Sequence, residues 1–410
     1  MSKKGLWLWR DLVPRSNERK TSQQAKIFLG FVDKTLSEQH PFVDKVLTSK
    51  FLPVFCNLKV YRSSHIAKEL PSQEGDYLYP RRGLHRYFNF FKVLSIILSH
   101  VGSGSSKSIV LFVRNEPIFL IACVIGKFIL RCFGARVDLV FQSSFPHESY
   151  SGRLLQRIFT RFLFKLCFIA VDRFIAVSQL GLDRLSKYGN GVQTKGYAIP
   201  LLSEYPRGIG ESGKRVGCPL VKLVYIGSLQ DDRQFDLIYN AYMKAKKRVP
   251  EMSLTVFGTI PSHNIYPEVE FRGFVERKTM LKDLPNFDIG ICLIPFEPKF
   301  HECSPTKLGD YIQEGIVPLC SGDIAGLKEV SNAIYSMIPT PIFCDDAISS
   351  ALHTLANWPI AHADEARAAV SKFHYEKYNY EARRAFINEA IHGVNDLKKI
   401  DGKYASGQDS

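Results

Sequence analysis

Apolar positions along the first half of the chain follow two alternating patterns. Short runs of β-branched and aromatic residues are separated by longer segments whose apolar residues recur at helical spacing. This alternation predicts βαβ units, and therefore an α/β fold built on parallel sheets. We expect strands at 108–115, 136–144 and 172–178, and a helix over 116–134 that ends at Gly134.

The second half of the chain repeats this rhythm. Strands are expected at 221–229, 252–259, 269–275, 287–296 and 316–321. Helices are expected over 235–249, from Pro305 to Gly315, and over 379–399. No internal repeat of solenoid length appears, which excludes the repeat architectures.

A chain of 410 residues exceeds what one hydrophobic core usually holds, so two domains are expected. We predict a first domain at 1–203, a linker at 204–219, a second domain at 220–385 and a C-terminal helix and tail at 386–410. The linker region is rich in Gly, Pro and charge, and its "GIGESG" has the glycine spacing of a phosphate loop. Prolines lie on both sides of it, where such a loop needs a strand and a helix, so we reject that interpretation.

Charge divides the chain in the same place. Residues 1–200 contain 30 Lys and Arg against 13 Asp and Glu, whereas residues 201–410 contain 24 against 27. The basic half is expected to face something anionic. The nine cysteines occur singly without a C-x-x-C pair, which favours a reducing compartment and no structural zinc.

Neither a secretory signal nor a membrane-spanning segment is expected. Arg10 and Asp11 interrupt the apolar start of the chain, and the longest apolar run, 117–130, is broken by Lys127. The protein is therefore expected to be soluble or bound to a membrane surface.

One segment of the first half combines basic and apolar residues at helical spacing. Arg153, Arg157, Arg161 and Lys165 recur every four residues, with leucine, isoleucine and phenylalanine between them. A basic amphipathic helix of this kind suits an anionic membrane surface. The alternative is a core helix whose basic side chains are merely solvated.

The sequence "ECSPTKLGDYIQEG", residues 302–315, carries candidate chemistry. Ser304 is expected to cap a helix that has Pro305 at its first position, and Gly315 is expected to end it. Free backbone amides at Thr306, Lys307 and Leu308 would then bind an anion, aided by the Lys307 charge.

With its surroundings, this stretch resembles the nucleotide-binding half of GT-B glycosyltransferases, especially the E-x7-E enzymes of family four that make bacterial surface polysaccharides. The resemblance implies two Rossmann-like domains facing across a cleft. It also implies that Glu302 meets the donor sugar and that Asp310, in place of the second Glu, meets the nucleotide ribose. "LVYIGSLQDDRQFD" is similar to the family's diphosphate loop, with Ser228 at its Arg position and Arg233 at its Lys position.

The resemblance is weaker in the first domain. The family's glycine-rich loop after the first strand has no counterpart in residues 6–20. His147, which follows the expected strand 136–144, is the candidate there for contacting the donor sugar or the acceptor. The predicted catalytic residues are thus Glu302, Lys307 and His147. The predicted donor-binding residues are Gly227, Ser228, Arg233, Gly258, Val275, Ser304, Pro305, Thr306, Leu308 and Asp310.

The function implied is transfer of a sugar, of the hexosyltransferase type, from a nucleotide-diphosphate sugar to a glycan or polyprenyl-linked acceptor, with retention of configuration. No metal and no cofactor are expected, because Arg233, Lys307 and the helix start would neutralise the diphosphate. The expected location is the cytoplasm, on the inner face of the cytoplasmic membrane, without a nucleic-acid partner. The alternatives are a sugar-nucleotide epimerase, an inactive relative that only binds, and a basic nucleic-acid-binding protein.

Overall fold

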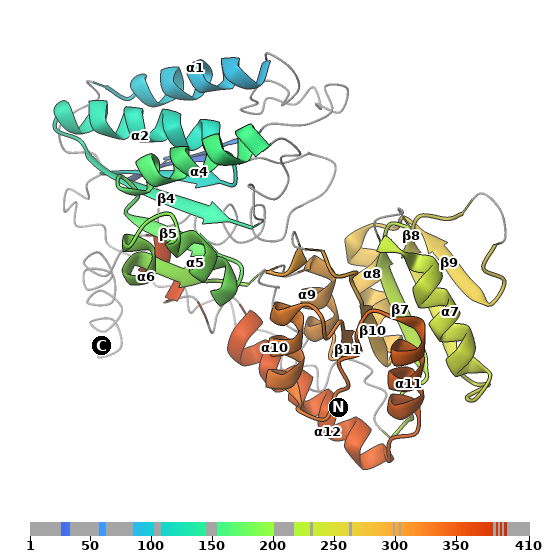
Figure 1. Ribbon diagram of the computed structural model, residues 1–410. Coiled ribbons are helices and arrows are strands. Elements are labelled where there is room, and N and C mark those ends of the chain that lie inside the picture. Colours follow the sequence, from blue (N-terminus) through green and yellow to red (C-terminus); the bar gives the residue numbers. More distant parts are fainter. Residues whose placement is uncertain are drawn as a thin grey trace, which may run out of the picture.

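The computed structural model folds the chain into two lobes, each built on one parallel sheet (Figure 1). It describes residues 26–32, 57–62, 85–101, 108–144, 154–200, 217–229, 233–261, 265–297, 300–302, 305–379, 383, 386–387 and 389–391. The predicted α/β fold with two Rossmann-like domains is confirmed. Most of the predicted linker lies outside the described residues.

The first sheet has six parallel strands in the order β2-β1-β3-β4-β5-β6. They are β1 (Lys26–Val32), β2 (Asn57–Arg62), β3 (Ser108–Arg114), β4 (Arg136–Ser143), β5 (Arg173–Ala176) and β6 (Gly196–Ala198). Its helices are α1 (His85–Leu98), α2 (Pro117–Cys132), α4 (Leu154–Phe168), α5 (Gln179–Ser186) and α6 (Gly191–Lys195). Helices α1, α2 and α4 cover one face, where Ile97, Leu120 and Phe164 enter a common core.

The described residues within 386–391, which follow the second lobe in the sequence, lie on the other face of this sheet. Ile387, Ala390 and Ile391 pack against apolar residues of β1, β3 and β4. The Tyr197 hydroxyl lies 3.2 Å from the Glu389 carboxylate, and Arg173 donates to the Ile391 carbonyl oxygen at 2.8 Å. Part of the predicted C-terminal helix thus belongs structurally to the first lobe.

The second sheet has five parallel strands in the order β11-β10-β7-β8-β9. They are β7 (Lys222–Gly227), β8 (Ser253–Gly258), β9 (Val269–Gly273), β10 (Ile289–Cys292) and β11 (Val317–Cys320). Its helices are α7 (Phe235–Lys246), α8 (Arg277–Asp283), α9 (Thr306–Gln313), α10 (Ala325–Ile334), α11 (Asp345–Ala356) and α12 (Ile360–Phe373), with a 3-10 turn at Leu284–Asn286 and a π-helical turn at His374–Tyr378.

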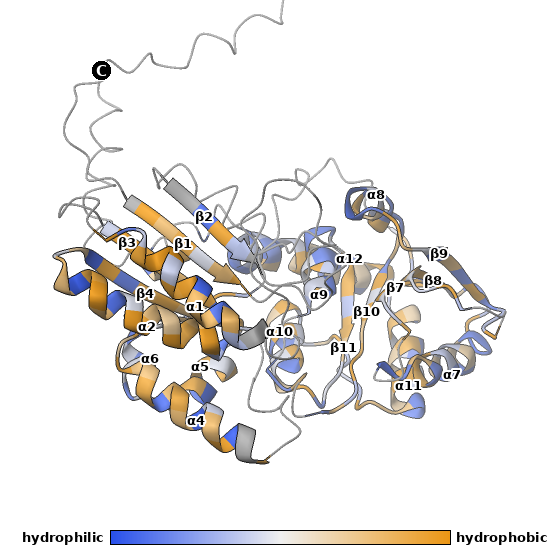
Figure 2. Cartoon of the chain, turned by 90° about the horizontal axis from the view of Figure 1, so that it is seen from above, coloured by the Kyte–Doolittle hydropathy of each residue, from blue (hydrophilic) through white to orange (hydrophobic). Residues whose placement is uncertain are grey.

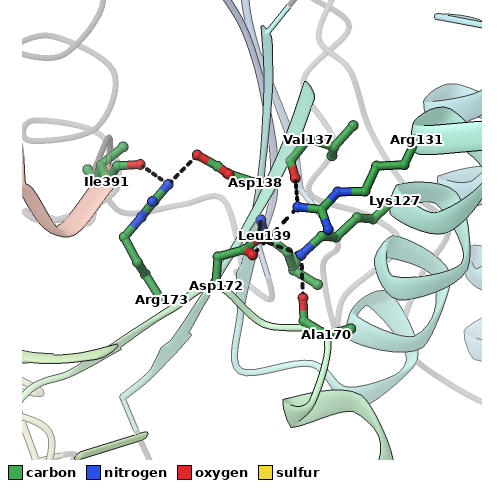
Figure 3. A network of polar contacts seen from close by, with 9 residues as sticks. All are labelled: Lys127, Arg131, Val137, Asp138, Leu139, Ala170, Asp172, Arg173 and Ile391. Carbon is green, nitrogen blue, oxygen red and sulfur yellow. Dashed lines mark hydrogen bonds and ion pairs between the residues drawn. The ribbon is translucent and has the colours of Figure 1, made fainter. Parts of the chain in front are cut away.

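Each sheet is held at its amino edge by an aspartate that directly precedes a strand. Asp172, before β5, accepts from the Leu139 amide at 2.6 Å and pairs with buried Lys127 of α2 at 2.5 Å (Figure 3). Asp288, before β10, accepts from the Lys222 amide at 2.9 Å and pairs with Arg367 of α12 at 3.0 Å. A buried carboxylate is stable in such a place because cations and backbone amides satisfy it.

The predicted elements differ from the observed ones in several places, three of which follow. The first described strand begins at Lys26, after the segment 6–20, where the resemblance would place the end of the family's first strand. Strand β10 ends at Cys292 rather than at residue 296, because the Ser321 hydroxyl takes over both backbone hydrogen bonds of Ile294. Helix α9 begins at Thr306, with Pro305 in extended conformation at the N-cap position instead of the first helical position.

Candidate active site

Two glycines end neighbouring strands at the carboxyl edge of the second sheet. Gly227 closes β7 with φ 149° and Gly258 closes β8 with φ 154°. A Cβ atom on Gly258 would lie 1.8 Å from the Gly227 carbonyl oxygen, so another residue cannot fit there without moving the backbone. In parallel sheets ligands bind at this edge, which is where both predicted donor residues lie.

Tyr311 fixes helix α9 above the same edge. Its ring packs on Gly290 of β10, where a Cβ atom would lie 2.3 Å from the ring. Its hydroxyl accepts from the Ile226 amide at 3.0 Å and lies 3.3 Å from the Val224 carbonyl oxygen. Burial raises the pKa of Tyr311 well above its usual value, so the hydroxyl keeps its proton and can donate.

Lys307 lies in the first turn of α9, over the end of β7. Its ammonium nitrogen is 4.3 Å from the centre of the Tyr225 ring, within the range of a cation–π contact. The Tyr225 hydroxyl donates to the Ser228 carbonyl oxygen at 3.2 Å. Tyr225 therefore connects the predicted cation of α9 with the predicted diphosphate loop after β7.

Arg233, the second predicted cation, lies beyond that loop. Its guanidinium carbon is 5.1 Å from the centre of the buried Phe300 ring. The next residue, Gln234, has φ 48°, a left-handed conformation at the N-cap of α7 that is uncommon outside glycine and asparagine. Arg233 therefore contacts the segment that leads to Glu302.

Glu302 contacts the first lobe. Its carboxylate accepts from Arg184 Nε of α5 at 2.7 Å, and its carbonyl oxygen accepts from the Ser178 hydroxyl at 3.1 Å. Arg184 also donates to the Ser143 hydroxyl at 2.9 Å, at the carboxyl end of β4. Both side chains of the Arg184–Glu302 ion pair are largely buried.

Sequence reasoning missed Arg184, Ser178 and Ser143. The N-cap position of Ser178 was a visible signal, since its hydroxyl accepts from the Gly181 amide three residues later. The contact with Glu302 had no sequence signal, because the partners are more than a hundred residues apart and lie on different lobes.

Asp310 is buried inside α9 and pairs with Arg277 at the start of α8. This pairing directs the carboxylate toward the start of α8. Arg277 was not expected in the site.

The remaining predicted site residues make fewer contacts that bear on ligand binding. Leu308 is fully buried, and its amide donates to the Pro305 carbonyl oxygen at 3.1 Å. The prediction of a free Leu308 amide is therefore wrong, because the first turn of α9 already uses it. Thr306 is exposed at the helix start, and Val275 is partly exposed after β9. His147 and Ser304 lie outside the described residues.

Within the described parts of the chain, no group of three or more His, Cys, Asp or Glu side chains is arranged to hold a metal ion. No helix in these parts is both long and apolar enough to cross a membrane.

No family model matches the sequence, and no curated protein sequence is similar to it. Solved structures match its fold. The apo form of the lipopolysaccharide outer core galactosyltransferase WaaB has a TM-score of 0.59 at 13% identity, over 89% of this chain and 99% of that one. The glycotransferase of kitacinnamycin has a TM-score of 0.52 at 10% identity, over 90% and 100%. The pneumococcal O-GlcNAc transferase GtfA, solved with UDP and GlcNAc, has a TM-score of 0.50 at 14% identity, over 73% and 60%. These likenesses establish the GT-B fold.

Proposed function

We propose that this protein is a glycosyltransferase that moves a hexose from a nucleotide-diphosphate sugar to a glycan or polyprenyl-linked acceptor in the synthesis of a cell-surface polysaccharide. The observation that carries the proposal is the position of Lys307. It lies at the start of α9, over the carboxyl end of β7, in a GT-B fold. A cation and a helix N-terminus at this place suit the diphosphate of such a donor.

The residues of the second lobe divide the work on the donor. Lys307, Arg233 and the start of α9 would neutralise the diphosphate as it leaves, which is where the transition state gains negative charge. This arrangement needs no metal and no cofactor. The backbone at Gly227 and Gly258 would border the nucleotide, and Asp310, oriented by Arg277, would accept a hydrogen bond from the ribose.

Glu302 would accept hydrogen bonds from hydroxyl groups of the donor sugar. Its ion pair with Arg184 offsets the charge of this largely buried carboxylate and fixes its direction. No protein nucleophile is assigned, which favours retention of configuration by attack of the acceptor on the face that the diphosphate leaves. Residues 1–203 would bind the acceptor, with His147 as a candidate contact, and residues 220–385 would bind the donor.

A lipid-linked acceptor places the protein at a membrane surface, and we propose the inner face of the cytoplasmic membrane. The classes that compete are a sugar-nucleotide epimerase, an inactive relative that only binds, and a nucleic-acid-binding protein. Epimerisation or hydrolysis of a sugar nucleotide without transfer would favour the first. Salt-sensitive retention on nucleic acid would favour the last.

The test begins with a screen of UDP-, GDP- and other nucleotide sugars for thermal stabilisation, since a ligand of the folded state raises the melting temperature. With the stabilising donor, Lys307→Ala and Glu302→Ala should each lower transfer by at least about tenfold, because each removes a charge-assisted contact. Lys328→Ala, on an exposed position of α10, is the matched control and should leave transfer unchanged. Near-parental transfer in both site variants would refute the assignment.

A further inference from the structure

Large apolar side chains are exposed unevenly over the molecule. Among the described residues, 21 large hydrophobic side chains are exposed, and 12 of them lie on or directly after α1, α2 and α4. These are Tyr87, Phe88, Phe91, Ile125, Phe128, Phe133, Leu154, Ile158, Phe159, Phe162, Leu166 and Ile169. Single exposed apolar residues are normal on a protein surface, but a group on adjacent elements marks an interaction surface.

The three helices lie side by side on one face of the first sheet (Figure 1). Helix α1 packs on α2, and α2 packs on α4. Their inner sides, with Ile97, Leu120 and Phe164, already fill the core of the lobe. The outer residues are therefore additional to what folding of the lobe needs. Figure 2 shows apolar residues along all three helices. We call the outer side of α1, α2 and α4 the helical face.

The charge of the helical face has a single sign. The sequences of α1, α2 and α4 contain no aspartate and no glutamate. Arg161 and Lys165 are exposed among the apolar side chains, and Lys92 and Arg157 are partly exposed. Arg131 is exposed as well, but its guanidinium pairs with Asp172 at 3.7 Å. On α4 the stripe expected from the sequence is present from Arg157 onward, and Ile158, Phe159 and Phe162 surround it with more than half of each side chain exposed.

We propose that the helical face docks onto a bilayer that contains acidic phospholipids. Aromatic and aliphatic side chains would enter the boundary between headgroups and acyl chains, while the interleaved Arg and Lys meet the lipid phosphates. The proposed function enters this inference only through the lipid-linked acceptor, which would give the docking its purpose. The docking itself is inferred from the exposed residues of the helical face.

Charge distinguishes this occupant from a second copy of the chain. In a two-fold dimer the helical face would meet itself and oppose cations with cations, without acidic residues on these helices to offset them. A nucleic acid would match the charge but would leave Ile158, Leu166 and Ile169 without a suitable partner. An acidic bilayer satisfies both the cations and the apolar residues.

The topology relates this face to the candidate site. In a parallel sheet, each crossover helix starts near the carboxyl edge of the strand before it. Helix α2 follows the carboxyl end of β3, and α4 follows that of β4, where Ser143 binds Arg184. The first turns of α2 and α4 would thus be the parts of these helices nearest Arg184 and Glu302. An acceptor held in the bilayer would reach the candidate site from that end of the helices.

The test measures sedimentation of the full chain with vesicles of phosphatidylcholine alone and of phosphatidylcholine mixed with phosphatidylglycerol. We expect binding to the mixed vesicles, weakened by salt, and little binding to the neutral ones. Phe159→Ser with Phe162→Ser, and separately Arg161→Glu with Lys165→Glu, should each weaken binding by at least about tenfold. The changed residues are exposed, so the fold should persist.

Matched controls come from the second lobe. Met337→Ser with Ile342→Ser removes equally exposed apolar residues, and Lys247→Glu with Lys328→Glu reverses two exposed cations. Both controls should bind like the parent. Equal loss in controls and face variants, or equal binding to neutral vesicles, would overturn the proposal. A third result would also overturn it: light scattering shows that the parent is a dimer, the parent binds no vesicles, and only the face variants are monomers.

Vesicle binding is read without any sugar. Binding with no transfer to any acceptor would therefore support the helical face and count against the proposed function. Transfer by a chain that binds neither type of vesicle would support the proposed function and count against docking by the helical face.

Discussion

The two lobes share a plan but differ in what they expose. Both are parallel sheets covered by helices. In the first, three adjacent helices present aromatic and aliphatic side chains to solvent on one face. In the second, most of the exposed apolar residues among those described lie in loops, as at Ile260, Phe274 and Phe296, rather than on adjacent helices. The cores of the two lobes are alike, whereas their outer surfaces differ, and this difference supports the two proposed roles, docking of the first lobe on a bilayer and binding of the donor by the second.

Each lobe also has an aspartate that precedes the strand next to an edge of its sheet, and this permits a direct comparison. The Asp288 side chain is fully buried, whereas 27% of the Asp172 side chain is exposed. Asp288→Ala leaves Arg367 buried without its partner, so it should lower the free energy of unfolding by about 3–5 kcal/mol. Asp172→Ala should cost about half as much, because water can reach that site. Urea unfolding followed by circular dichroism measures both.

A control for this pair is available on α12. Asp364 also binds Arg367, at 2.8 Å, but is more exposed than Asp288. Asp364→Ala leaves Arg367 its ion pair with Asp288, so it should cost about 1 kcal/mol or less. Equal losses from all three substitutions would mean that burial does not separate these carboxylates.

Features that depend on residues close together in the sequence could be predicted, whereas contacts between distant residues could not. Strands such as β3 and β8 were visible because their apolar runs are local, and Gly315 marked the end of α9, where it has φ 73°. Strands β1 and β2 were missed, since a short apolar run alone does not distinguish a strand from a buried loop. The placement of Lys307 at a helix start was predictable, but its contact with Tyr225 was not. Arg277 and Arg184 were missed because their partners are distant in sequence.

The second prediction concerns acid and the packing beneath α9. His374, in the π-helical turn after α12, is 1% exposed, and burial lowers its pKa from 6.5 to about 4. Between these values the unfolded chain binds a proton that the folded chain excludes, so stability falls as the pH is lowered from 7 toward 4. The loss should approach about 3 kcal/mol.

His374→Leu tests this because a neutral side chain removes that proton uptake. The variant should lose less stability than the parent over the same range of pH, as measured by urea unfolding at each pH. Phe373→Leu, a neighbouring neutral substitution, should keep the parental dependence. If His374→Leu loses stability as steeply as the parent, another group causes the acid sensitivity.

The smallest effect expected concerns the contact that joins the lobes. Arg184 binds Glu302 and Ser143 but is not assigned to the substrate, so it is a positioning residue. Arg184→Gln should lower kcat/KM for the donor by about 5- to 30-fold, corresponding to about 1–2 kcal/mol. Arg184→Lys, which keeps the charge but not the planar fork, should recover part of this loss. In the double variant with Glu302→Gln, the two losses should not add, because both remove the same interaction. Strict additivity, or a loss in melting temperature without any change in kcat or KM, would show that Arg184 only holds the lobes together and does not orient the carboxylate that we propose meets the sugar.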